Sequence, residues 1–125
     1  MTWGLWCVLI AGLLPYIATG AAKWGAKNYD NHNPRVWLAN QTGFRARGNS
    51  AQANAFETFP LFAAGVLIAS FVHAPQASID IWATIFVIAR TFYIVFYLID
   101  KDRLRSLSWL IGVISVVALF VISKG

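Results

Sequence analysis

The sequence predicts an all-α membrane protein, a single domain in which four transmembrane helices form a bundle. The first observation is composition: 58% of the 125 residues are hydrophobic and 12% are charged, whereas soluble domains average about 45–50% and about 25%. The second is the pattern of four long apolar segments separated by polar turns. A soluble domain of this kind would have too few polar residues to cover its surface. The six tryptophans also fit indoles that anchor at lipid headgroups.

The first and last of the four apolar segments have the simplest pattern. Residues 3–22 contain no charged residue, and about 20 residues at 1.5 Å each span the hydrocarbon core of a bilayer. A cleaved signal peptide is an alternative for this segment, but the usual basic amino-terminal region is missing. Residues 104–122 are almost uniformly apolar and predict another crossing.

The two middle segments carry polar residues within a predicted membrane span. Residues 44–72 begin with a polar half, and Pro60 is expected to bend the helix where that half ends. Residues 79–99 have Arg90 near their middle. Residues 23–43 form a polar connector. One domain over residues 1–125 is therefore expected, with helices at about 3–22, 44–72, 79–99 and 104–122.

The lysines and arginines indicate orientation. They gather in the connector with the start of the second helix, and in the turn between the third and fourth helices, whereas the opposite side holds only Lys124. By the positive-inside rule both basic loops are cytoplasmic and both termini face away from the cytosol. The basic residues form no stripe interleaved with aromatic residues, so the charge of +5 does not indicate nucleic-acid binding.

Several other classes are disfavoured. Cys7 is the only cysteine, which excludes an internal disulfide and a paired redox motif. His32 has no histidine or cysteine at ligand spacing, so no metal site is expected. No internal repeat of the kind found in transporters is visible, which makes a small transporter the weakest interpretation.

One face of the second helix carries a cation, an amide and a carboxylate. Arg47, Asn54 and Glu57 share this face by helical geometry, with Ser50 on it and Gln52 beside it. The donors and acceptors are graded from the cytosolic rim inward, as expected for a small zwitterionic ligand that enters from water. Polar groups within a membrane are expensive and tend to mark function.

A second polar face is expected on the third helix, where Arg90, Tyr93 and Tyr97 fall on one side. A purely structural interpretation remains open for each residue. Glu57 and Arg90 can form a buried ion pair that specifies helix packing, and Asn54 can serve as a hydrogen-bonding group between helices.

These motifs resemble the membrane-associated proteins in eicosanoid and glutathione metabolism, the MAPEG family. The second helix is similar to the signature of the family. The third and fourth helices match the family patterns in the same order. The matching residues of the connector and second helix are most similar to those of short bacterial members. The matching residues are Asn33-Pro-Arg35, Arg47, Ala51-Gln-Ala-Asn54, Phe56-Glu57, Phe59-Pro60, Arg90-x2-Tyr93-x3-Tyr97 and Arg105-x3-Trp109.

The resemblance implies a homotrimer in a membrane, expected to be the bacterial inner membrane, with glutathione as co-substrate between neighbouring subunits. It implies transfer of glutathione to lipophilic electrophiles, or reduction of lipid hydroperoxides. Arg47, Gln52, Asn54 and Glu57 would hold the tripeptide, with Glu57 facing its ammonium group.

The resemblance assigns the remaining roles to the other helices. Tyr93 and Tyr97, with Arg90 on the same face, would line the site, and Arg105 would lie beside the glutathione sulfur as the catalytic residue. The hydrophobic substrate would arrive through the membrane lipid and meet apolar walls from four phenylalanines, which are Phe56, Phe59, Phe62 and Phe92.

Position 50 departs from the family pattern. Conjugating members commonly carry an arginine one turn before the asparagine, and this chain has Ser50. An alternative function is therefore a non-catalytic lipid-binding or scaffold protein on the same fold.

Overall fold

The computed structural model describes all residues from 1 to 125 as a helical protein with no strand. Four long helices and one short helix make up the chain. They are α1 (Trp3–Lys23), α2 (Pro34–Ala39), α3 (Gly43–Phe71), α4 (Gln76–Leu98) and α5 (Asp102–Ile122). The predicted fold class, an all-α bundle of four long helices, is confirmed. The third long helix begins at Gln76, three residues before the predicted start at Ile79.

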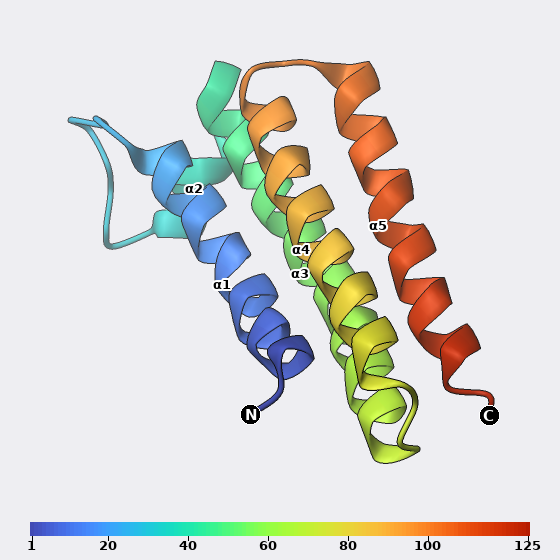
Figure 1. Cartoon of the computed structure of the whole chain (residues 1–125). Helices are drawn as coiled ribbons and strands as arrows, with labels where there is room; N and C mark the ends of the chain where they lie inside the picture. Colours follow the sequence, from blue (N-terminus) through green and yellow to red (C-terminus); the bar gives the residue numbers. More distant parts are fainter.

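The four long helices lie side by side, and both chain termini are at the same end of the bundle (Figure 1). The turn between α3 and α4 is also at that end. The connector with α2, together with the turn between α4 and α5, lies at the opposite end, here called the connector end. Eight of the ten lysines and arginines lie in or next to these two connector-end loops: Lys23, Lys27, Arg35, Arg45, Arg47, Lys101, Arg103 and Arg105.

All four long helices are long and apolar enough to cross a membrane. Within the apolar 18-residue stretch of each long helix, only 28–33% of the residues are buried inside the chain. The rest of these apolar surfaces cannot face water without a large cost, because burial of apolar area is the main favourable term in folding. They therefore face lipid or other protein, and the chain is an integral multi-pass membrane protein.

The connector contains a helix that the sequence pattern did not predict. In α2, Pro34 occupies the first turn, where its missing N–H has no cost. Trp37 and Leu38 are buried against Ala22 of α1. Six residues are too few to display a helical period, so the sequence pattern predicts only a polar connector here.

The largest core cluster is built by all four long helices, with Cys7 and Ala11 of α1 packed against residues of α3, α4 and α5. Phe62 and Phe86 stack with ring centroids 3.9 Å apart, and both are buried. Val66 of α3 and Leu119 of α5 belong to the same cluster. The polar first half of α3 continues without a break through Pro60, so the apolar core and the polar residues of this helix are held on one continuous element.

The turns after α3 and α4 have the same construction. His73 and Asp100 adopt positive φ values of 57° and 62°. The next N–H groups, of Ala74 and Lys101, donate to carbonyls five residues earlier at 2.9 and 2.8 Å. This is the Schellman arrangement, which satisfies helix-end carbonyls and ends a helix sharply. Both hairpins are therefore tight, and they hold their paired helices in contact.

The amino-terminal end of α1 is capped by a side chain from α4. Asp80 Oδ1 accepts a hydrogen bond of 2.9 Å from the Gly4 N–H and one of 2.8 Å from Gln76 Nε2. The Gly4 N–H is among the first donors of α1, which have no partner within the helix. A carboxylate also interacts favourably with the positive end of the helix dipole. Asp80 therefore ties α1 to α4 at the termini end.

Replacing Asp80 tests this cap. We expect Asp80→Ala to lower the free energy of unfolding by about 0.5–2 kcal/mol, the usual effect of losing a helix cap. Asp80→Asn keeps an acceptor oxygen and should lose less. Thermal unfolding in detergent, followed by circular dichroism, measures both. An unchanged midpoint for Asp80→Ala would show that the contact contributes nothing to stability.

Candidate functional site

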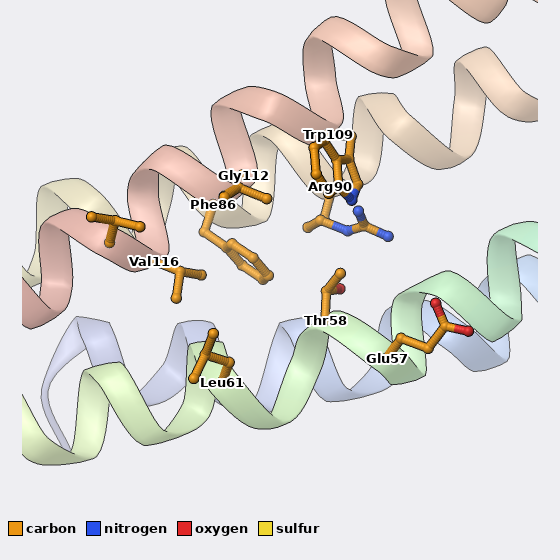
Figure 2. Close-up of a pocket in the computed structure, with 10 residues that line it drawn as sticks. Glu57, Thr58, Leu61, Phe86, Arg90, Trp109, Gly112 and Val116 are labelled. Carbon is orange, nitrogen blue, oxygen red and sulfur yellow. The ribbon is translucent and has the colours of Figure 1, made fainter.

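A pocket of about 180 Å³ opens between α3, α4 and α5 beside Arg90. Its residues, which define the Arg90 pocket, are Glu57, Thr58, Leu61, Phe86, Arg90, Trp109, Gly112, Val113, Val116 and Val117. Figure 2 shows Arg90 and Trp109 on one side, facing α3 with Glu57 and Thr58. The pocket is thus polar toward Glu57 and apolar toward Leu61 and Val116.

The guanidinium of Arg90 has only neutral partners within the chain. Its side chain is 2% exposed, and Nη2 donates a 2.7 Å hydrogen bond to Asn54 Oδ1. Its Cζ atom lies 4.0 Å from the centroid of the Tyr93 ring. The ion pair with Glu57 that the sequence left open does not form, since Glu57 is exposed and Arg90 pairs with Asn54 instead. A buried cation without a carboxylate is a costly arrangement and a strong site for an anion.

Two arginines are linked by a pair of tyrosine rings. Tyr93 and Tyr97 contact edge to face at 5.6 Å, and Arg105 Cζ lies 4.5 Å from the Tyr97 centroid. Arg90, Tyr93, Tyr97 and Arg105 form a continuous row, here called the Arg–Tyr row. Cation–π contacts of this kind hold guanidinium groups in place without neutralising their charge. The structure therefore brings together four residues that the sequence assigned to the site.

Arg47 lies away from the Arg90 pocket. Its Nε and Nη2 donate to the carbonyl oxygen of Leu98 at 3.3 and 3.2 Å. Arg45 has a similar position at α1, where Nη1 donates to the carbonyls of Ala22 and Trp24 at 3.0 and 2.9 Å. Arginines suit the carbonyl ends of helices, where the dipole is negative. Both arginines thus fasten α3 to the connector ends of neighbouring helices.

Gln52 lies in a different pocket from Glu57 and Arg90. The expectation that Gln52 sits beside the Arg47 face is wrong, because five residues of helix rotate a side chain by about 140°. This second pocket, of about 520 Å³, is called the Arg35 pocket. Its residues are Thr19, Lys23, Pro34, Arg35, Leu38, Asn49, Gln52, Ala53 and Phe56.

The apolar wall of the Arg90 pocket differs from the four phenylalanines expected. Phe62 is buried in the core, and Phe59 packs against that core. Phe56 lines the Arg35 pocket, and Phe92 lines an apolar surface groove between α4 and α5. The wall is made instead by side chains that include Phe86 and three valines of α5.

Thr58, Trp109 and Gly112 were missed as pocket residues. Trp109 is part of a family pattern, but nothing in the sequence indicates that it closes a pocket over Arg90. Gly112 leaves space there: a Cβ at this position would lie 3.5 Å from Arg90 Cδ, an ordinary contact. Gly112 follows Trp109 by three residues. This i, i+3 spacing is the only sequence signal that places both residues on one face of α5.

The arrangement joins a fixed positive charge to an apolar wall within a membrane. The buried guanidinium can stabilise an anion, the nearby Glu57 carboxylate can receive a cation, and the valine wall can receive an apolar group. No group of three or more histidine, cysteine, aspartate or glutamate side chains is placed to hold a metal ion. The site therefore places a cation, a carboxylate and an apolar wall side by side.

Fold and site together define an integral membrane protein with a polar pocket inside a four-helix bundle. The MAPEG family model matches residues 3–124. The chain belongs to the MAPEG family, which includes glutathione-dependent transferases and peroxidases. Searches of curated proteins and of solved structures return no match.

Proposed function

We propose that this protein is a membrane-embedded glutathione-dependent transferase or peroxidase that acts on lipophilic electrophiles or hydroperoxides. The observation that carries the proposal is Arg90, a buried guanidinium whose only hydrogen-bond partner is the neutral side chain of Asn54. Family membership supports glutathione as the ligand, because members generally use it. An anionic ligand at Arg90 would supply the negative charge that the chain itself does not provide.

The roles of the site residues follow from their charges. Glu57 is exposed at the edge of the Arg90 pocket and can face the ammonium group of the tripeptide. Arg90, Tyr93, Tyr97 and Asn54 then contact the tripeptide or hold one another in position. Arg47 acts from a distance in this scheme, since its guanidinium is bound to the Leu98 carbonyl.

Arg105 is the proposed catalytic residue. A thiol with a pKa of about 8.5 is mostly protonated at neutral pH, and the thiolate is the nucleophile. A guanidinium nearby favours the thiolate and stays charged at every physiological pH. Arg105 is held on the Tyr97 ring and ends the Arg–Tyr row.

Arg105→Ala should therefore reduce turnover more than binding. We expect kcat to fall by about 10²–10³-fold, the range seen when one electrostatic stabiliser of the reacting atom is removed, with the glutathione dissociation constant changed by less than about tenfold. Steady-state kinetics and calorimetric titration measure the two effects. Arg103→Ala, an exposed arginine of the same turn, is the control. Full activity in Arg105→Ala would refute the assignment.

The lipophilic substrate enters from the bilayer in this proposal. Leu61, Val116 and Val117 line both the Arg90 pocket and an adjoining apolar groove along α3 and α5. A substrate dissolved in lipid can therefore lie in the groove with its reactive group toward Arg90. The thiolate and the electrophile would meet without the substrate crossing water.

A homotrimer is proposed to complete the site. The Arg90 pocket, at about 180 Å³, is smaller than the range of about 300–1,000 Å³ usual for small-molecule sites. Gln52, which the family pattern assigns to glutathione, faces the Arg35 pocket instead. A neighbouring copy that supplies its Gln52 face to the Arg90 pocket would enlarge the site, as the family resemblance implies. Such a head-to-tail contact closes into a ring of three when each copy is rotated by one third of a turn.

The proposed location is a bacterial inner membrane with the connector end in the cytosol. The concentration of lysines and arginines at the connector end supports this orientation. Cytosolic glutathione would then reach the Arg–Tyr row from the connector end, and both termini would face away from the cytosol.

A non-catalytic lipid-binding or scaffold protein is the second candidate, because Ser50 is exposed and uncharged where catalytic members commonly have arginine. One assay separates the two. Purified protein in detergent is tested with glutathione against aryl halides and hydroperoxides, with Arg90→Met as the matched inactive variant. Thiol-dependent turnover that Arg90→Met lacks supports the enzyme. No turnover across the panel, with lipid retained during purification, supports the scaffold.

A further inference from the structure

An apolar groove runs along the surface between α4 and α5, which lie side by side (Figure 1). Its lining residues, which define the α4–α5 groove, are Ile85, Ile88, Ala89, Phe92, Phe96, Leu104, Leu107, Ser108 and Ile111. None of them lines the Arg90 pocket, which uses other faces of the same two helices. From Ile85 to Phe96 the groove extends about 16 Å along α4, at a rise of 1.5 Å per residue. This length is close to one leaflet, which is half of a hydrocarbon core about 30 Å thick.

Ser108 is the one polar residue of the α4–α5 groove. It is 6% exposed, and its hydroxyl forms no hydrogen bond within the chain. The hydroxyls of Thr91 and Ser115 have the common arrangement of a membrane helix, because each donates to the carbonyl four residues earlier at 2.8 Å. A buried hydroxyl without a partner costs free energy. A ligand that offers an acceptor oxygen inside the groove would remove that cost.

Charges of both signs lie at the connector end of the groove. They line a polar surface hollow, here called the charged turn, formed by Asp100, Lys101, Asp102, Arg103 and Leu104. Leu104 lines both the charged turn and the α4–α5 groove, so the two are continuous. The charged side chains are exposed, and their one hydrogen bond is from the Arg103 N–H to Asp102 Oδ1 at 2.9 Å. Two carboxylates and two cations have no net charge together, so the charged turn complements a zwitterion better than an anion.

We propose that the charged turn and the α4–α5 groove bind one phospholipid of the connector-end leaflet. Its headgroup carries an ammonium group beside the phosphate, as in phosphatidylethanolamine. The ammonium group pairs with Asp100 and the phosphate with Lys101. An ester carbonyl accepts a hydrogen bond from Ser108, and an acyl chain lies along the apolar wall. This lipid site is separate from the glutathione site proposed above.

The spacing of these groups fits the covalent structure of a phospholipid. Ser108 follows Lys101, the residue that precedes α5, by seven residues, or about 10 Å along the helix. The long lysine side chain and the glycerol unit between phosphate and ester together bridge this distance. The acyl chains begin at the esters, where Leu107 and Ile111 continue the groove. A helix of a neighbouring copy would offer Ser108 no free carbonyl, because its backbone groups are bonded within the helix.

The test combines a protein without the hydroxyl and a lipid without the ester. Native mass spectrometry of the full chain in detergent measures the affinity for phosphatidylethanolamine with ester-linked chains. The same titration uses the ether-linked analogue, which has no ester carbonyl. Wild type is compared with Ser108→Ala. Ser106→Ala is the matched control, because Ser106 is an exposed serine of the same helix that lies outside the groove.

Wild type and Ser106→Ala should bind the ester lipid about three- to tenfold more tightly than the ether lipid, the usual effect of one hydrogen bond. Ser108→Ala should bind both lipids with the affinity that wild type has for the ether lipid. Equal affinities in wild type, or no binding, would overturn the inference. A preference for the ester that survives in Ser108→Ala would also overturn it. A changed number of subunits in Ser108→Ala would assign the groove to a neighbouring copy instead of a lipid.

A second arm tests the headgroup with phosphatidylglycerol, which has the phosphate but no ammonium group. Wild type should bind phosphatidylethanolamine about two- to fivefold more tightly, the range of one exposed ion pair. Asp100→Asn should reduce that preference. Asparagine tolerates the positive φ of 62° at this position, so the turn is kept. Equal or tighter binding of phosphatidylglycerol by wild type would overturn the assignment of a zwitterionic headgroup.

Discussion

Arg90→Met should remove glutathione-dependent activity while leaving the protein as stable as wild type, or more stable. The guanidinium is 2% exposed and has no carboxylate partner. Replacing a buried ionic group by an apolar side chain of similar volume is often neutral or stabilising. The loss of the charge-assisted hydrogen bond to Asn54 costs about 1.5–3 kcal/mol, and removal of the desolvation penalty of a buried cation offsets it. Stability and function should therefore respond differently to this one substitution.

The expected loss in kcat/KM is about 10²–10³-fold, because a preorganised charge in a water-poor site is worth several kcal/mol. Steady-state kinetics and thermal unfolding measure the two quantities on the same preparation. Arg103→Met, at an exposed arginine in the first turn of α5, is the control and should leave both unchanged. A lowered unfolding midpoint with full activity would show that Arg90 serves packing and not ligand binding.

Gly48→Leu should give the largest loss of stability of any substitution described here. A Cβ at this position would lie 2.8 Å from Ala22 Cβ and 3.2 Å from both Ala18 O and Ala22 Cα. Two of these are backbone atoms, which cannot rotate away. Overpacking of this kind costs about 1–3 kcal/mol, and the gain from removing a helical glycine is about 1 kcal/mol or less.

The matched control for this prediction is Gly20→Ala, in α1. No atom lies within 4 Å of the position of its Cβ, so the substitution should be neutral or stabilising by up to about 1 kcal/mol. Thermal unfolding of both variants in the same detergent tests the contrast. Equal midpoints for Gly48→Leu and wild type would mean that α1 and α3 do not depend on their close approach.

Separating α1 from α3 should also weaken the ligand site. Arg45 of α3 is bound to the carbonyl of Ala22, and the Arg35 pocket is shared by these two helices and α2. Gly48→Leu is therefore expected to weaken glutathione binding even where the protein remains folded. The small residues at this contact therefore determine how Arg45 and the Arg35 pocket are positioned.

The long helices could be predicted from composition and period alone, because membrane spans require long runs of apolar residues. The same pattern gives no information on α2, whose formation depends on burial of Trp37 and Leu38 after the chain has folded. It also misses Asp80 as the cap of α1, since Gly4 and Asp80 are far apart in sequence. Contacts between distant segments are set by packing, which no single segment encodes.

Helical geometry predicted part of the site. Arg90, Tyr93 and Tyr97 were placed on one face of α4, and the structure links them through ring contacts. The same geometry turns Gln52 about 140° away from Arg47, so the expectation of Gln52 beside the Arg47 face misapplies the helical period.

Other candidate side chains are held away from the Arg90 pocket by contacts with the rest of the fold. Arg47 is bound to a helix-end carbonyl, and Phe62 is stacked in the core on Phe86. A charge or ring suited to a ligand is equally suited to these structural partners, and only the fold determines which of the two it contacts.

A titration of detergent-purified protein with glutathione and with an S-alkyl glutathione tests the proposed function most directly. Saturable binding of both, accompanied by the ultraviolet absorbance of a thiolate with glutathione only, is the expected result, because only the free thiol can ionise. Arg90→Met should bind neither ligand. Absence of binding by wild type at millimolar glutathione would contradict the assignment of this chain as a glutathione-dependent enzyme.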